Sequence, residues 1–232
     1  MKVIAIVPAL DEALHVGAVV SGLRSRGVSV MVIDDGSTDA TSDVARSAGA
    51  EVVRHETPRG VGAAIAAGMA RAHDADAAVV LAGDGQMDVR DLPALLGPIA
   101  RGEADVVKGN RLAWPEGALA FPLVRLLGVV GLAAATRVAT GLRVDDAQCG
   151  YVAVGRRALR EIPWARLWPS FGYPNDLLSR VARLGLRLAE VPVRPVYGAE
   201  QSKLRARHVP GIAFVVGRAL AARMRGHSPP RT

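Results

Sequence analysis

The segment AAVVLAGDGQMD, residues 77–88, ends an apolar run on a carboxylate and an amide set among glycines. Asp84 and Gln86 offer hard oxygen ligands of the kind that Mg²⁺ or Mn²⁺ binds. A magnesium ion usually takes one or two protein oxygens and fills its remaining positions from water and substrate phosphates. The alternative is an ordinary turn in which Asp88 caps the next helix. The segment alone leaves both interpretations open.

Two other loops could bind parts of a nucleotide. Asp34 and Asp35 follow the apolar run VSVMVI, where carboxylates can accept hydrogen bonds from a ribose hydroxyl or a base edge. A solvated turn before a helix is the alternative there. In PRGVGAA (58–64), two glycines precede a helical pattern and could admit a phosphate. That spacing matches neither Walker A nor GxGxxG.

Several other kinds of site are disfavoured. The five histidines lie far apart without metal-ligand spacing, and no G-x-S-x-G motif occurs. Cys149 is the only cysteine, which excludes an intramolecular disulfide and fits a reducing compartment. We interpret Cys149 as structural. No charged-then-apolar leader opens the chain, so we expect a cytoplasmic protein.

Charge is divided unevenly along the 232 residues. Residues 1–110 hold ten Lys/Arg and fifteen Asp/Glu, a net charge of −5, whereas residues 111–232 hold nineteen and seven, a net charge of +12. The basic half could meet nucleic acid, a membrane surface or an anionic substrate. Only three Phe, three Tyr and three Trp are present, which argues against nucleic acid because single-strand binders stack bases on aromatic rings.

The elements that would position these loops alternate regularly. Over residues 1–110, strand-like and helix-like patterns follow one another, which predicts an α/β fold with a doubly wound, mostly parallel sheet flanked by helices. Ligands of such sheets bind outside the carboxyl ends of the strands. The loops to consider are therefore 8–12, 34–39, 57–62 and 82–88.

The second half contains an apolar segment, residues 117–141, interrupted by Arg125 and Arg137. Its longest uncharged run is eleven residues, shorter than the roughly 20 that span a bilayer, so we expect no transmembrane helix. A last helix follows Pro210, with Arg218 and Arg225 opposite an apolar face. Its apolar residues are Ile212, Val215, Val216, Ala219 and Leu220. Together these segments fit either peripheral contact with the anionic inner face of a membrane or a core helix followed by a solvated tail.

Across residues 1–205 the chain resembles the family 2 glycosyltransferases of GT-A fold. It is most similar to the branch that transfers sugars to polyprenyl phosphates such as dolichyl phosphate. The motifs that carry the resemblance are VPALDE (7–12), VIDDGSTDAT (32–41), RGVGAAIAAG (59–68), GDGQMD (83–88), KGNR (108–111), DDAQCGY (145–151), YPNDLL (173–178), AEVPV (189–193) and QSKLR (201–205).

The resemblance implies a donor site in residues 1–110. Its expected donor-binding residues are Pro8, Leu10, Glu12, Asp34, Asp35, Ala63, Gly83, Asp84 and Lys203. The family's D-x-D triplet falls on Ala82, Gly83 and Asp84, so its first aspartate is absent. Asp84 would bind Mg²⁺ or Mn²⁺ with help from Gln86, and the donor diphosphate must supply more of the shell.

An acceptor site is implied in residues 111–205, before a basic helix and tail at 206–232. Arg111, Ser202, Lys203 and Arg205 match positions that meet phosphates, for which Arg and Lys are suited by charge. Asp146 and Asp176 would lie near the reacting sugar, and Asp176 is the better candidate for a base. Solvated surface charges are the alternative for the basic residues.

The implied activity is inverting, metal-dependent transfer of a sugar from a nucleotide sugar to a polyprenyl phosphate. GDP-mannose is the favoured donor, with a UDP-sugar next. A transferase of the same fold with a soluble acceptor is a second hypothesis, and a non-catalytic nucleotide-sugar binding protein, suggested by the absent aspartate, is a third.

Overall fold

The structure is a computed structural model, and it describes residues 1–115, 117, 121–196 and 208–226. Seven strands form one sheet in the order β3-β2-β1-β4-β6-β5-β7. The strands are β1 (Val3–Ala9), β2 (Ser29–Asp34), β3 (Glu51–Arg54), β4 (Ala77–Val80), β5 (Val106–Asn110), β6 (Val152–Gly155) and β7 (Leu188–Pro192). Strand β6 pairs antiparallel with β4 and β5, and every other pairing is parallel. The expected mostly parallel α/β sheet is confirmed.

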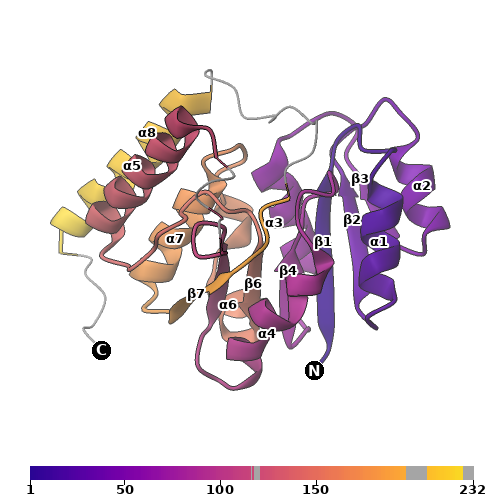
Figure 1. Cartoon of the computed structure of the whole chain (residues 1–232), viewed down its shortest axis with the longest axis horizontal. Helices are drawn as coiled ribbons and strands as arrows, with labels where there is room; N and C mark the ends of the chain where they lie inside the picture. The colour runs from indigo at the N-terminus through magenta and orange to yellow at the C-terminus, as the bar shows by residue number, and fades with distance from the viewer. Residues whose placement is uncertain (116, 118–120, 197–207, 227–232) are drawn as a thin grey trace.

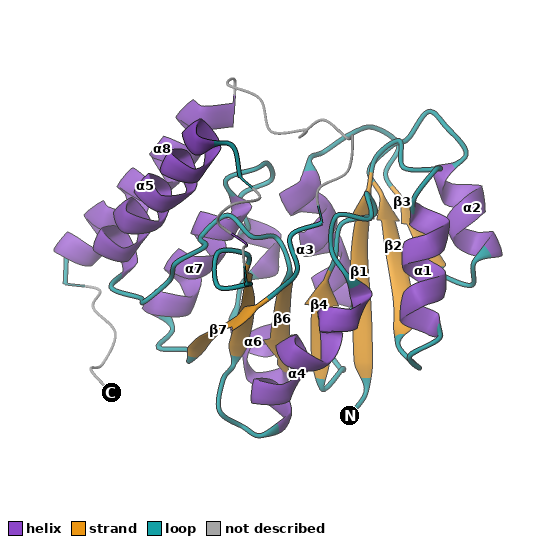
Figure 2. Cartoon of the chain, viewed as in Figure 1, coloured by secondary structure: helices purple, strands orange, loops and turns teal. Residues whose placement is uncertain are grey.

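Helices cover both faces of this sheet (Figures 1 and 2). They are α1 (Val16–Arg24), α2 (Thr41–Ser47), α3 (Val61–Arg71), α4 (Leu92–Ala100), α5 (Leu123–Thr140), α6 (Arg156–Glu161), α7 (Tyr173–Arg183) and α8 (Val209–Met224), with short 3-10 turns at Val89–Asp91 and Trp164–Arg166. One core cluster joins the sheet to α3, α6 and α7, and a second joins it to α1, α2 and α4. Because both faces of the sheet are covered, its strands are apolar at consecutive positions. In β1, for example, Ile6 faces the first cluster and Val7 the second.

The reversed strand β6 determines which segments meet at the ligand-binding edge. The parallel strands all end at one edge of the sheet, and β6, running the other way, begins there. Residues 145–151, which precede β6, therefore lie at the same edge as the loops that follow β1, β2, β4 and β5. The loops expected to bind ligands thus share one edge with the DDAQCGY motif.

Helix α5 differs from the expectation for residues 117–141. It is a continuous 18-residue helix that packs against α7 and α8, and only 28% of it is buried. By length and composition alone, α5 could cross a bilayer. The uncharged-run criterion was therefore too strict, because Arg125 and Arg137 lie near the two ends of the helix. The core-helix alternative is wrong, since most of the α5 surface faces outward.

Helix α8 has the expected buried face. Ile212, Val215 and Ala219 are buried, and Val216 and Leu220 are half-buried. Helices α5 and α8 lie side by side at the end of the molecule away from β3 (Figure 1). The Arg223 guanidinium donates to the backbone oxygen of Val138 at 2.6 Å, which fixes the C-terminal ends of the two helices together.

Candidate active site

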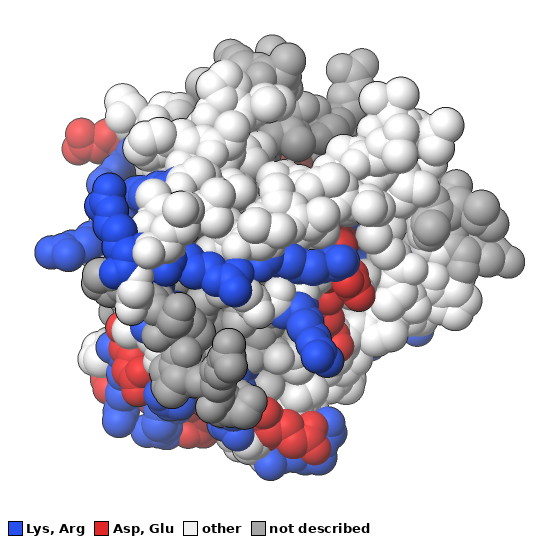
Figure 3. Space-filling view, turned by 90° about the vertical axis from the view of Figure 1, so that its left-hand side faces the viewer, with Lys and Arg blue, Asp and Glu red and all other residues white. Residues whose placement is uncertain are grey.

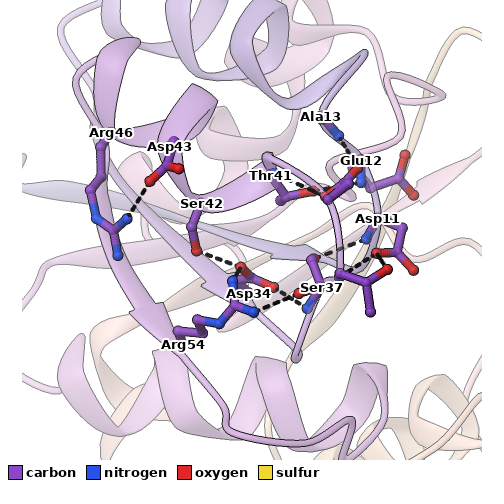
Figure 4. Close-up of polar contacts among 12 residues, drawn as sticks. Asp11, Glu12, Ala13, Asp34, Ser37, Thr41, Ser42, Asp43, Arg46 and Arg54 are labelled. Carbon is purple, nitrogen blue, oxygen red and sulfur yellow. Dashed lines mark hydrogen bonds and ion pairs between the residues drawn. The ribbon is translucent and has the colours of Figure 1, made fainter.

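The loop after β1 is tied to the loop after β2 by backbone-to-side-chain hydrogen bonds (Figure 4). Asp11 has a φ of +54°, which few residues other than glycine adopt, and its N–H donates to Ser37 Oγ at 2.9 Å. Its carboxylate accepts from the Thr38 N–H at 2.8 Å. The buried Glu12 donates its N–H to Thr41 Oγ1 at 2.8 Å. These contacts fix the segment that contains Pro8, Leu10 and Glu12, the expected nucleotide-pocket residues.

Asp34 is completely buried at the end of β2. Burial works to raise the pKa of this carboxyl, but hydrogen bonds from Ser37 and Ser42 and the charge of Arg54 outweigh it, so the pKa lies below its usual value. The Ser37 N–H donates at 2.8 Å and the Arg54 guanidinium at 3.0 Å. Asp34 is thus an ionised anchor for the loop, and any contact with a nucleotide would add to these bonds.

Asp35 anchors a different segment. It is also buried, and its carboxylate accepts from the N–H groups of Arg59 and Gly60 at 2.9 and 2.7 Å. His55 Nδ1 lies 2.7 Å from the same carboxylate. Asp35 therefore holds the loop that leads into α3, and the solvated-turn alternative for Asp34 and Asp35 is wrong.

The predicted phosphate site at 58–64 is wrong. The N–H groups of Gly62 and Ala63, at the start of α3, both donate to the Pro169 carbonyl oxygen, at 2.8 and 3.2 Å. A Cβ on Gly60 would lie 2.4 Å from that oxygen, and one on Gly62 would lie 1.9 Å from the Trp168 oxygen. These glycines admit another stretch of backbone instead of a phosphate. The Ala63 N–H is already used there, and its donor contact stays a prediction.

Substitution of Gly62 by Ala should therefore destabilise the fold. The new methyl group would meet backbone that cannot rotate away, and we expect a loss of about 1–3 kcal/mol in the free energy of unfolding. For a domain of this size that corresponds to a melting temperature lower by about 2–12 °C in a thermal scan.

Gly128→Ala is the matched control, because a Cβ at this position in α5 meets nothing within 4 Å. It should raise the melting temperature slightly, since alanine is favoured over glycine within helices. Equal melting temperatures for the two variants would contradict the packing described here.

Asp84 lies in the turn after β4, between two glycines. Its Oδ1 accepts the Gln86 N–H at 3.0 Å, and the N–H of Gly83 donates to the Pro8 oxygen at 3.0 Å, which sets the turn against the end of β1. Asp84 is only half-buried. No group of three or more His, Cys, Asp or Glu side chains gathers for a metal among the described residues. A metal ion at this turn would have to take most of its ligands from phosphates and water.

The turn that the sequence offered as the alternative for this segment is present. Asp88 accepts the Arg90 N–H at 2.8 Å at the start of the next 3-10 turn, as an N-cap does. The capping role at the start of this 3-10 turn therefore belongs to Asp88.

Arg111 and Asp146 form a buried ion pair. Arg111 Nε and Nη2 donate to the two Asp146 oxygens at 2.7 and 2.9 Å, and the Cys149 N–H donates to the same carboxylate at 3.1 Å. Asp146 is completely buried. Burial works to raise its pKa, but Arg111 outweighs this and holds the pKa below its usual value. The neighbouring Asp145 is 63% exposed and pairs with Arg137.

Asp176, the predicted base, is engaged by two arginines. It is buried at the start of α7 and accepts from Arg180 Nε at 3.0 Å and from Arg218 Nη2 of α8 at 2.5 Å. The Trp168 N–H donates to it as well, at 2.9 Å. In this arrangement Asp176 joins α7, α8 and the Trp168 loop. Arg218, which lies opposite the apolar face of α8 as expected and is 48% exposed, is therefore also an ion-pair partner of Asp176.

Tyr173 connects Asp84 with the second half of the chain. Burial raises the pKa of its phenol, the Asp84 carboxylate adds to the increase, and Arg111 acts in the opposite direction. Asp84 and Arg111 are therefore both within electrostatic reach of one buried ring. The structure brings Asp84, Arg111 and Asp146 to the same edge of the sheet. Ser202, Lys203 and Arg205 lie outside the described residues, and their roles stay predictions.

Residues 4–162 match the family model described as glycosyl transferase family 2. The chain belongs to this family. It is a glycosyltransferase, so the hypothesis of a non-catalytic binding protein is not retained.

Among the relatives of the glycosyltransferase that have named activities are two enzymes named for a lipid phosphate. One is the undecaprenyl-phosphate mannosyltransferase of Micrococcus luteus, 31% identical over 83% of this chain and 83% of the relative. The other is the UDP-N-acetylglucosamine–dolichyl-phosphate N-acetylglucosaminyltransferase of Methanococcus voltae, 26% identical over 88% of this chain and 89% of the relative.

A solved structure matches the whole glycosyltransferase chain. It is glucosyl-3-phosphoglycerate synthase from Mycobacterium tuberculosis, in complex with Mn²⁺, UDP-glucose and phosphoglyceric acid, with a TM-score of 0.72 at 23% identity over 100% of this chain and 81% of that one. The glycosyltransferase therefore has the expected GT-A fold.

Sequence reasoning did not assign two charged groups of the glycosyltransferase, one buried and one half-buried. Lys108 is 1% exposed and donates to the Cys149 oxygen at 2.5 Å, and burial lowers its pKa. Glu190 accepts the N–H groups of Asp145 and Asp146 at 2.7 and 3.1 Å, and burial raises its pKa. Both lie within the motifs KGNR and AEVPV. A charged residue inside an apolar strand pattern was the signal that could have identified them, because a charge in such a place needs a partner. Cys149 is buried with a raised thiol pKa, which fits its structural interpretation.

Proposed function

We propose that this glycosyltransferase moves a sugar from a nucleotide sugar to a polyprenyl phosphate, with inversion and with Mg²⁺ or Mn²⁺. The observation that carries the proposal is the state of the two carboxylates expected beside the reacting sugar. Asp146 and Asp176 both accept hydrogen bonds from arginines, so neither is available as a base. A hydroxyl acceptor needs a base, whereas a monophosphate is already anionic near neutral pH.

The comparisons support a lipid phosphate as the acceptor. The two named relatives carry undecaprenyl phosphate and dolichyl phosphate in their names. With such an acceptor, catalysis reduces to positioning and to neutralisation of charge. Arg111, fixed by Asp146, would present its guanidinium where phosphate oxygens gather.

The carboxylate of Asp84 supports a divalent ion, Mg²⁺ or Mn²⁺, as the cofactor. A divalent ion bound by this carboxylate would offset the negative charge that develops on the leaving diphosphate. The absent first aspartate of the triplet is consistent with a shell completed by phosphate oxygens and water. The GT-A neighbour was crystallised with Mn²⁺ and a UDP-sugar. We keep GDP-mannose as the first donor to test and UDP-sugars as the second.

The test is a transfer assay that varies donor, acceptor and metal. Purified enzyme is incubated with GDP-mannose, UDP-glucose or UDP-N-acetylglucosamine and with a short-chain polyprenyl phosphate, and lipid-linked sugar is measured after extraction. We expect product from one donor, and a loss of at least about 100-fold with EDTA that Mn²⁺ or Mg²⁺ reverses. From an α-linked donor, NMR should show a β-linked product.

3-Phosphoglycerate serves as the soluble acceptor in parallel reactions. Transfer to it without transfer to polyprenyl phosphate would replace the lipid acceptor with a soluble one. Undiminished transfer after removal of all divalent metal would overturn the role of the ion.

A further inference from the structure

The exposed side of α5 is apolar along its whole length. Five large side chains on this side are between 48% and 84% exposed; we call them the α5 stripe, and they are Leu123, Val124, Leu127, Val130 and Val138. At 100° per residue they share one side of the helix, with Ala134 between them. The opposite side, which includes Val129, Ala133 and Thr136, is buried. Helix α5 is thus amphipathic, with an apolar face toward solvent.

Helix α8 extends this surface. It packs parallel to α5 and adds the exposed side chains Val209, Phe214 and Met224. Figure 3 shows this end of the molecule as a broad uncharged area crossed by a band of Lys and Arg. Exposed apolar areas of this extent mark protein or membrane contacts.

The charges on the two helices have one sign. Neither α5 nor α8 contains an acidic residue, and the arginines on them are Arg125, Arg137, Arg218 and Arg223. Two of these, Arg137 and Arg218, pair with carboxylates of other segments, Asp145 and Asp176. Cationic side chains beside an aliphatic face complement anionic headgroups above a hydrocarbon layer. A protein partner of ordinary composition would more commonly meet mixed charges at the rim of its interface. The charge pattern therefore favours an anionic lipid surface.

One end of the stripe adjoins the candidate active site. The Phe121 ring, just before α5, lies between two guanidinium groups, with Arg111 5.4 Å and Arg125 5.6 Å from its centroid. Arg111 is also the residue held by Asp146 at the end of β5. A membrane surface along the stripe would therefore place lipid phosphates next to Arg111.

We propose that the α5 stripe is a membrane-contact surface, on which the enzyme lies peripherally against an anionic bilayer such as the inner face of the cytoplasmic membrane. This inference rests on the proposed function, because it explains how a water-insoluble acceptor reaches the site. Helix α5 lies along the bilayer surface and does not cross it, since its other side packs on α7 and α8.

Vesicle flotation with the whole chain tests this. Vesicles of phosphatidylcholine with one quarter phosphatidylglycerol should bind the wild-type protein in low salt, and pure phosphatidylcholine should bind it less. Leu127→Glu should reduce binding to the anionic vesicles about tenfold or more, because it places a charge in the stripe. Leu14→Glu is the matched control: Leu14 is 90% exposed near α1, and its substitution changes the net charge equally.

Three further measurements distinguish membrane contact from misfolding, from dimer formation and from failure of the proposed transfer reaction. Unchanged melting temperatures would show that both variants are folded. Failure of the wild type to float, or equal flotation of the two variants, overturns the proposal. Light scattering that shows a wild-type dimer, lost in Leu127→Glu, without vesicle binding would assign the stripe to a second copy. Transfer to a water-soluble short-chain acceptor should survive in Leu127→Glu, so a failed membrane test and a failed transfer assay are distinguishable.

Discussion

Asp84→Asn should lower the rate of sugar transfer by at least about 100-fold while the fold survives. The asparagine Oδ1 can still accept the Gln86 N–H, so the turn after β4 is retained. The substitution removes the negative charge that would hold a divalent ion. A loss of about 2.7–4 kcal/mol in transition-state stabilisation corresponds to a rate lower by a factor of roughly 100 to 1,000. The measurement is the turnover number at saturating donor and Mn²⁺, with a melting curve alongside.

Asp88→Asn is the control for this substitution. Asp88 lies four residues further on, and its carboxylate already binds the Arg90 guanidinium and N–H. Asparagine can still accept the Arg90 N–H, and a pair whose arginine is 67% exposed contributes no more than about 1 kcal/mol to stability, so transfer should change by no more than about twofold. Wild-type turnover by Asp84→Asn across a Mn²⁺ titration would refute the assignment of the metal to this residue.

Asp146→Ala should cause the largest loss of stability. The substitution leaves Arg111 and the fully buried Lys108 without their nearest shared carboxylate, and removal of one partner from a buried ion pair costs about 3–5 kcal/mol. For a chain of this size the melting temperature should fall by about 6–20 °C. Asp145→Ala is the adjacent control: that carboxylate is 63% exposed, and the loss should stay below about 1 kcal/mol.

The difference between wild type and Asp146→Ala should depend on pH in a defined direction. Arg111 holds the pKa of Asp146 below its usual value despite burial, so the ionised carboxylate stabilises the native state above the unfolded pKa of about 3.9. That stabilisation is lost as the pH falls through the folded pKa. The gap between the two unfolding free energies should therefore be constant near neutral pH and narrow below about pH 4. A gap that widens on acidification would show that Asp146 is not the ionised partner.

Local patterns in the sequence were sufficient to predict the sheet and to place Asp84 in a turn at the carboxyl end of a strand. Short apolar runs identify strands, and the edge where parallel strands end follows from topology, so the turn at residues 82–88 could be placed before its structure was known. Contacts between distant segments could not be read in this way. Gly60 and Gly62 resemble a phosphate loop, but the group they admit is the backbone of Trp168 and Pro169, more than a hundred residues away.

The same limit applies to the charged residues of the second half. The resemblance predicted that Arg111, Asp146 and Asp176 lie in the site region, but spacing does not show that Asp146 binds Arg111 or that Asp176 binds Arg180 and Arg218. Those partners decide whether a carboxylate can take a proton. Solvent exposure of α5 was likewise hidden, because an apolar helix has the same composition whether it is buried or lies at a surface.

Because β6 runs in the reverse direction, the segment between β5 and β6 could be exchanged to accommodate a different acceptor. Residues 111–151 leave the sheet at the end of β5 and return at the start of its neighbour β6, so both ends of this excursion are anchored at one rim. The entropy of closing a loop grows only slowly with its length. An insertion carrying a different helix could therefore replace α5 while the strand register and the Asp84 turn stay as they are, and a new acceptor could be accommodated without rebuilding the donor half.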